Sequence, residues 1–280
     1  MSSRRKKDKA DRAPRTAFVA RPFAGLPGET DWVALREVVP AATAPLSLKD
    51  GTELTLATVL PLAWPGMVRA DGRRFLGLQV ASRSGDASRD LAAVLEQVMT
   101  SAPGASVVTT DLAGPGPRLQ DLLTDTALQV SVHDGFDFWV EGADDPDGEV
   151  AASMERANAS VVPTQRLTSV QSGYWCRLRE RAHLRWVLPH DEEPLLDALA
   201  RMSVGGGLGL GDGTRYVGSF RAHGLLVPVW DLPVAMTADE VEEPAAAWGA
   251  RLDEALAGTG LSDAARRARQ GLLSRQLTLR

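Results

Sequence analysis

Short segments in which apolar and polar residues alternate recur along the chain, and each pair of them is followed by a stretch with helical spacing. Alternation with a period of two is typical of strands that bury one face. Apolar residues at positions i, i+3, i+4 and i+7 are typical of helices that bury one face. The combined pattern predicts four successive β-hairpin–helix units.

The part of the chain before these units is expected to form one short helix. Residues 21–29, which we call the Pro-Gly segment, are rich in proline and glycine and predict an extended stretch. Thr30 can cap the helix that follows. Pro40 ends it, because proline has no amide hydrogen to donate.

The first two units lie in the N-terminal half. Residues 54–60 and 76–80 are expected to pair in a hairpin that turns at Asp71-Gly72, with a long, irregular connection. Residues 128–132 and 136–140 are expected to pair around a tight turn. The helices of these units are expected at residues 91–99, capped by Asp86 or Ser88, and at residues 149–159.

The other two units lie in the C-terminal half. The third is expected to pair two apolar sets across a hairpin, namely Tyr174, Cys176 and Leu178 with Leu184, Trp186 and Leu188. The fourth is expected to pair residues 216–220 with residues 225–229, and its helix begins at the capping box Thr237-x-x-Glu240. Further helices are expected at residues 192–202, capped by Asp191, and at residues 262–273.

These elements predict an α+β protein of antiparallel sheets with helices packed on one face. No single hairpin–helix unit can bury both faces of its sheet, so neighbouring units must share cores. We expect a disordered basic tail at residues 1–16, an N-terminal α+β half at residues 17–160 and a C-terminal α+β half at residues 161–280. The halves can also form one continuous domain, and their similarity raises the hypothesis of an internal duplication.

Composition excludes several classes of protein. The chain has 280 residues, of which 44% are hydrophobic and 24% are charged, as in ordinary folded proteins. The single cysteine, Cys176, excludes an intrachain disulfide and a multi-cysteine zinc site. No apolar stretch approaches the roughly 18 residues of a membrane helix, and the basic start lacks the apolar core of a secretory signal. We therefore expect a cytoplasmic protein without a membrane span, and we predict no metal and no cofactor.

Charge is unevenly distributed along the chain. Lys and Arg number 31 against 36 Asp and Glu, which gives a net charge of −5. Residues 1–15 hold seven basic and two acidic residues, so the rest of the chain, with 24 basic and 34 acidic residues, carries −10. A basic tail can contact phosphates without sequence preference, whereas an acidic body opposes extensive nucleic-acid contact. The tail residues expected to bind a partner are Arg4, Arg5, Lys6, Lys7 and Lys9.

Histidines at the expected hairpin turns are candidates for chemistry. His133, His183 and His223 fall at or beside turns, and they would form a metal or acid/base cluster if the turns met at one end of the sheets. The alternative is three solvated turn residues. Arg221, His223 and Asp231 form the densest polar group, and they are candidates for catalysis or for binding an anionic partner.

Two further motifs favour structural roles. Cys176 lies inside an expected strand beside Trp175, where a cysteine is most often a small apolar core residue rather than a nucleophile. The glycine-rich segment 205–213 follows a helix, whereas phosphate-binding loops follow a strand and open a helix. We expect the end of a helix that runs into a loop there.

Several long strings of residues resemble a known family. They are residues 21–29 (RPFAGLPGE), 31–44 (DWVALREVVPAATA), 183–190 (HLRWVLPH) and 217–233 (VGSFRAHGLLVPVWDLP). In this order they resemble the actinobacterial domain of unknown function family 5926 over about residues 18–280. Many relatives also carry an N-terminal SEC-C zinc knuckle, which this chain cannot form because its tail has no cysteine. The resemblance implies a shared fold and a bacterial cytosolic setting, and it carries over no catalytic residues.

Three functions remain open from the sequence. The lack of any catalytic constellation favours a non-enzymatic interaction or adaptor protein with an unknown protein partner. The basic tail favours a nucleic-acid-associated or ribosome-associated factor. A cleft between the halves near Arg221, His223 and Asp231 would favour an enzyme or a small-ligand binder.

Overall fold

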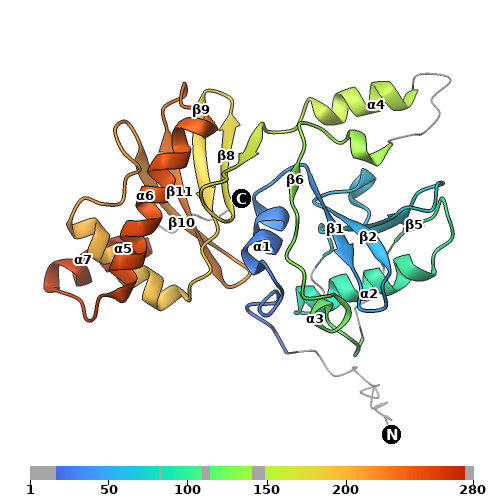
Figure 1. The fold of residues 1–280 in the computed structure, drawn as a ribbon, viewed down its shortest axis with the longest axis horizontal. Helices are drawn as coiled ribbons and strands as arrows, with labels where there is room; N and C mark the ends of the chain where they lie inside the picture. The colour runs from blue at the N-terminus through green and yellow to red at the C-terminus, as the bar shows by residue number, and fades with distance from the viewer. Residues whose placement is uncertain (1–16, 82–83, 109–113, 141–148, 275–280) are drawn as a thin grey trace, which may run out of the picture.

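The computed structural model describes residues 17–81, 84–108, 114–140 and 149–274. The basic tail expected at residues 1–16 lies outside these ranges. The described chain forms two β-sheets, both mainly antiparallel, with helices packed against them, which confirms the predicted α+β class. Figure 1 shows the two sheets side by side, with helix α1 (Glu29–Glu37) between them.

Six strands form the sheet of the N-terminal half, in the order β5-β3-β4-β2-β1-β6. They are β1 (Ala42–Ser47), β2 (Glu53–Ala57), β3 (Gly66–Val68), β4 (Arg74–Gly77), β5 (Ser106–Val107) and β6 (Ser131–Val132). Helix α2 (Ala87–Thr100) packs on β3, β4 and β5. Asp86 caps the start of this helix, because its carboxylate accepts a 3.1 Å hydrogen bond from the amide of Ser88.

Strand pairing in the first unit differs from the expected hairpin between residues 54–60 and 76–80. Strands β2 and β4 are neighbours, but they run parallel, and β3 lies between them in the chain. The turn at Asp71-Gly72 joins β3 to β4, and the antiparallel partner of β2 is β1. Pro45 obscures β1 in the sequence, since proline is rare inside strands. It is tolerated because β1 pairs with the short β6 only at its start, ahead of Pro45.

The second unit also differs from its expected form. Strand β6 is short, and a 3₁₀ turn, η2 (Asp137–Trp139), replaces the returning strand. The rings of Phe136 and Trp139 stack 4.3 Å apart, and the Trp139 indole donates a 2.9 Å hydrogen bond to the carbonyl oxygen of Val59. These tertiary contacts outweigh the local alternation. The helix of this unit, α4 (Glu149–Asn158), forms as expected.

Five strands form the sheet of the C-terminal half, in the order β10-β11-β9-β8-β7. They are β7 (Thr164–Arg166), β8 (Gly173–Leu178), β9 (Arg181–Trp186), β10 (Arg215–Ala222) and β11 (Leu225–Leu232). Both expected hairpins of this half form, since β8 pairs with β9 and β10 pairs with β11. Helices α5 (Glu192–Val204), α6 (Ala238–Ala257) and α7 (Asp263–Ser274) pack together on this half (Figure 1).

The register of the β8–β9 hairpin differs from the expected apolar pairing by an odd number of residues. Trp175 lies opposite Leu184, and both side chains are buried in the core beneath the helices. Cys176 lies opposite His183, on the other face of the sheet. Cys176 and Leu184 were expected to share a face. A shift by an odd number of residues exchanges the two faces of a strand, so Cys176 faces away from the helices.

Helix α6 confirms the capping box expected at its start. The amide of Thr237 donates a 2.7 Å hydrogen bond to the Glu240 carboxylate. Pro244 lies inside the helix, which continues to Ala257. The described chain also contains the short helices η1 (Pro61–Ala63) and α3 (Leu119–Leu122). Within the described ranges, no helix combines the length and apolar character needed to cross a bilayer.

Helix α1 joins the cores of the two halves. The residue before it is Gly28, which has a left-handed conformation with a φ of 67°, so Thr30 lies inside the helix instead of capping it. One continuous apolar cluster contains Trp32 of α1, Leu76 of the six-stranded sheet and Phe220 of the five-stranded sheet. The halves therefore share a hydrophobic core. The division into halves between residues 160 and 161 and the internal duplication stay predictions.

Candidate functional site

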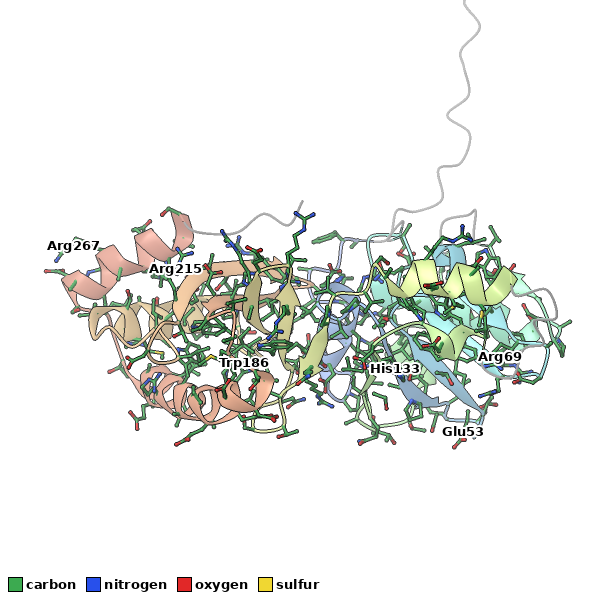
Figure 2. The ribbon with its side chains drawn as sticks, turned by 90° about the horizontal axis from the view of Figure 1, so that it is seen from above. Glu53, Arg69, His133, Trp186, Arg215 and Arg267 are labelled. Atoms are coloured by element: carbon green, nitrogen blue, oxygen red, sulfur yellow. The ribbon has the colours of Figure 1, made fainter. Side chains whose placement is uncertain are left out.

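Polar side chains line the face of the five-stranded sheet that lies opposite α5 and α6, beyond the area covered by α1. Arg181, His183 and Arg185 alternate along β9, and the residues between them are buried beneath the helices. The cross-strand register adds one residue each from β8, β11 and β10 to the same face. We call this set the open face: Cys176, Arg181, His183, Arg185, Arg215 and Asp231. Figure 2 shows Arg215 on the side of the sheet opposite Trp186, whose ring packs against α6.

Asp231 lies between two basic groups at the centre of the open face. Its carboxylate forms an ion pair with Arg215, and its Oδ1 atom lies 3.1 Å from Nδ1 of His183. Burial lowers the pKa of His183, the nearby charge of Asp231 opposes this effect, and Arg185 and Arg181 add to it. His183 is therefore a neutral ring at pH 7, held beside a carboxylate.

The row of Cys176, His183 and Asp231 has the residue types of a cysteine-nucleophile triad. Cys176 lies directly opposite His183 on the neighbouring strand, and His183 lies directly opposite Asp231. However, Cys176 is only 3% exposed, and burial raises the pKa of its thiol in spite of the nearby Arg185. A nucleophilic cysteine needs a lowered pKa and access to substrate. This row is therefore not arranged for nucleophilic catalysis.

The open face carries an excess of positive charge in an otherwise acidic molecule. Its three arginines outnumber its single carboxylate by two. Asp231 is paired with Arg215, whereas the side chains of Arg181 and Arg185 form no ion pair or hydrogen bond with the rest of the described chain. A guanidinium presents five N–H donors in a planar fork that fits carboxylates and phosphates. The chemistry that this face can recognise is anionic.

Arg221 and Asp231, two of the residues predicted as a catalytic or anion-binding group, lie far apart. Arg221 lies opposite Leu226 near the turn of the β10–β11 hairpin, and Asp231 lies at its other end. Leu226 and Asp231 are five positions apart on β11, a distance of about 17 Å. Arg221 forms an ion pair with Glu192 at the start of α5 and so points to the helix side of the sheet.

His223, the third member of the predicted group, belongs to the contact between α1 and the hairpin turn. Its Nε2 atom lies 2.8 Å from the Glu37 carboxylate, and its ring packs edge-on against Phe23 at 5.1 Å. Nearby, the Arg21 guanidinium donates a 2.7 Å hydrogen bond to Asp191, just before α5. These contacts connect the Pro-Gly segment and α1 to the C-terminal half. The structure thus does not bring Arg221, His223 and Asp231 together.

The three turn histidines lie in different surroundings. His133 Nε2 lies 2.8 Å from the hydroxyl of Thr43 on the six-stranded sheet, and burial lowers the pKa of His133. His183 belongs to the open face, and His223 contacts α1. Among the residues that the structure describes, no group of three or more His, Cys, Asp or Glu side chains is placed to hold a metal ion. The tail candidates lie outside the described residues and stay a prediction: Arg4, Arg5, Lys6, Lys7 and Lys9.

A buried polar cluster fixes α1 against the five-stranded sheet. The Asp31 carboxylate accepts hydrogen bonds from Arg166 at 3.2 and 3.3 Å and from the Ser172 hydroxyl at 2.8 Å. The Tyr174 hydroxyl makes no hydrogen bond of good geometry; burial and the negative charge of Asp31 raise its pKa. Ser172 is fully buried, with a φ of 57°. The groups of this cluster face one another inside the protein, so its role is structural.

Arg181, Arg185 and Arg215 are not among the residues that the sequence analysis selected for binding. A signal for two of them is nevertheless present in the string Arg181-Ala-His-Leu-Arg-Trp186. Basic residues at every second position, separated by apolar ones, predict a strand with one basic and one apolar face. Arg215 joins them only through the register across the sheet.

Comparison with known proteins supports the resemblance seen in the sequence strings. A search of curated proteins and a search of solved structures each gave no match. A family model, described as a family of unknown function (DUF5926), matches residues 22–280. These residues include nearly all of the described chain and all of the open face. Because the match covers far more than half of the sequence, the chain belongs to this family of unknown function (DUF5926).

Proposed function

We propose that this protein is a non-enzymatic interaction protein that holds an anionic partner on the open face. The observation that supports the proposal is the pair Arg181 and Arg185, whose guanidinium groups have no ionic partner in the described ranges. Charge-assisted contacts between a guanidinium and a carboxylate or phosphate are among the stronger hydrogen bonds in proteins. The cytoplasmic location expected from the sequence is part of the same proposal.

The scaffold beneath the open face supports this proposal. Strand β9 is hydrogen-bonded on both sides, to β8 and to β11. Below it, the rings of Trp186, Trp230 and Trp248 pack together with centroids 4.9 to 6.5 Å apart. A rigid strand holds its side chains at fixed spacing, so little conformational entropy of the backbone is lost when a partner binds.

The geometry gives less support to an enzymatic function of this protein. Arg221, His223 and Asp231 make separate contacts, with Glu192, with Glu37 and with Arg215 respectively. The one thiol, on Cys176, is buried and has a raised pKa.

The proposal is tested by partner capture with the full-length chain after reversal of charge on the open face. The double variant Arg181→Glu with Arg185→Glu is expected to lose the partners that crosslink to the wild type, because it replaces attraction by repulsion. A matched control, Arg156→Glu with Arg267→Glu, makes the same change in total charge on exposed positions of α4 and α7. We expect this control to retain the partners. If both double variants capture the same partners as the wild type, the open face is not the binding surface.

A further inference from the structure

The spacing of charges on the open face indicates the conformation of its ligand. On the basis of the proposed function, we infer that the open face binds an acidic segment of a partner protein as an extended strand that follows β9. Two carboxylates of this segment, four residues apart, contact Arg181 and Arg185. The inference depends on the distance between these arginines and on the groups that lie between them.

The distance between the arginines fits an extended ligand with carboxylates four residues apart. Arg181 and Arg185 are four positions apart on β9 and project from the same face. Strands rise about 3.3 Å per residue, so the two Cα atoms are about 13 Å apart. Residues i and i+4 of an extended peptide have the same separation, whereas in an α-helix they are only about 6 Å apart along the axis. In a helix, two carboxylates four residues apart would therefore reach only one of the arginines at a time.

The groups between the arginines restrict the ligand residue that lies midway between the two carboxylates. His183 lies midway between Arg181 and Arg185, and its ring is neutral at pH 7. Asp231, beside His183, is already engaged in an ion pair with Arg215. A third carboxylate above His183 would have no unpaired guanidinium of its own, unlike the two carboxylates that contact Arg181 and Arg185. We therefore expect a neutral residue at the centre of the ligand and acidic residues on either side.

The same face suits an acidic peptide better than a single-stranded nucleic acid. Proteins bind single strands through aromatic side chains that stack on the bases, as well as through basic residues. The aromatic residue directly across from Arg185 is Tyr174, which is fully buried. In addition, the chain outside the basic tail carries a net charge of −10, which repels a long polyanion.

Fluorescence anisotropy with the full-length chain tests this inference. The probes are labelled peptides of about nine residues. One peptide has two glutamates four residues apart among serines and threonines, and its isomer has the two glutamates adjacent. We expect the spaced peptide to bind about tenfold more tightly, because only this peptide reaches both arginines.

Matched variants show whether the preference comes from the open face. Arg181→Gln with Arg185→Gln is expected to abolish the preference for the spaced peptide, and Arg156→Gln with Arg267→Gln is expected to keep it. Thermal unfolding verifies that both double variants fold. Equal affinity of the wild type for the two peptides would overturn the inference, as would tighter binding of a single-stranded oligonucleotide of equal charge.

A failure of the acidic-strand inference can be distinguished from a failure of the proposed function. If neither peptide binds but charge reversal at Arg181 and Arg185 still removes the natural partner, the open face binds a different anionic ligand and only the inference of an acidic strand is wrong. If partner capture is also unaffected by charge reversal, the proposed function is wrong as well.

Discussion

At the scale of single residues, the turn between β10 and β11 shows how one backbone conformation connects distant segments. His223 and Gly224 both have positive φ, 47° and 83°. This combination is the one that a tight two-residue hairpin turn requires. A Cβ atom on Gly224 would lie 2.8 Å from the carbonyl oxygen of Ala20, just before the Pro-Gly segment. The chain there packs directly against the turn, and this close approach requires glycine.

Substitution of Gly224 tests the contribution of this close approach. Gly224→Ala is expected to lower the free energy of unfolding by about 2–3 kcal/mol, because it adds a clash with backbone to an unfavourable φ. Gly72→Ala is the matched control, since Gly72 has a φ of 86° and no atom within 4 Å of the new Cβ. Its cost is expected to be about 1 kcal/mol. Urea unfolding measures both changes, and equal losses would mean that the contact with Ala20 contributes nothing.

At the scale of elements, the sequence predicted the C-terminal hairpins but not the strand pairing of the N-terminal half. The β8–β9 and β10–β11 hairpins follow from alternation and short turns, which are local signals. The parallel pairing of β2 with β4 depends on β3, which packs beneath α2. A Cβ atom on Gly66 of β3 would lie 2.4 Å from Val98 of α2, so this packing requires glycine. No local pattern contains that information.

The open face could be predicted only in part, for a related reason. The basic side of β9 follows from the alternation in residues 181–186. The position of Arg215 opposite Asp231 depends on a bulge in β10 between Tyr216 and Gly218, which shifts the register by one residue. Alternation does not reveal a bulge of this kind. The grouping of Asp231 with Arg221 and His223 in the sequence analysis reflects proximity along the chain, whereas the hairpin separates them.

The attachment of α1 to the five-stranded sheet can be measured with a double-mutant cycle. Arg166→Met removes the cation beside Asp31, whose side chain is 3% exposed, while Arg166 is 31% exposed. We expect Arg166→Met to lower the free energy of unfolding by about 2 kcal/mol. This is less than for a fully buried pair, because water screens the exposed part of Arg166. Addition of Asp31→Asn is expected to restore part of this loss, since no unpaired charge is then buried.

Urea unfolding of the wild type, the two single variants and the double variant gives the coupling energy. Stability changes of the single variants that simply add in the double variant would show that Asp31 and Arg166 do not stabilise each other. In that case the apolar contacts of α1, such as those of Trp32, would account for its attachment.

At the scale of the whole molecule, the acidic body and the basic open face together provide selectivity. The net charge of the chain is −5, yet Arg181, Arg185 and Arg215 gather on one sheet face with a single carboxylate. An acidic partner is repelled by most of the surface and attracted at one place, which favours one orientation of binding. The core shared through α1 keeps the two halves together and holds that face in position.

NMR of arginine side chains in the full-length chain determines whether the open face is the binding surface. The peptide with spaced glutamates is titrated into the labelled protein while the Nε–H signals are recorded. We predict that the signals of Arg181 and Arg185 shift most, and that those of Arg156 and Arg267 stay unchanged. Shifts confined to arginines outside the open face, or no shift of Arg181 and Arg185 at saturating peptide, would contradict the account.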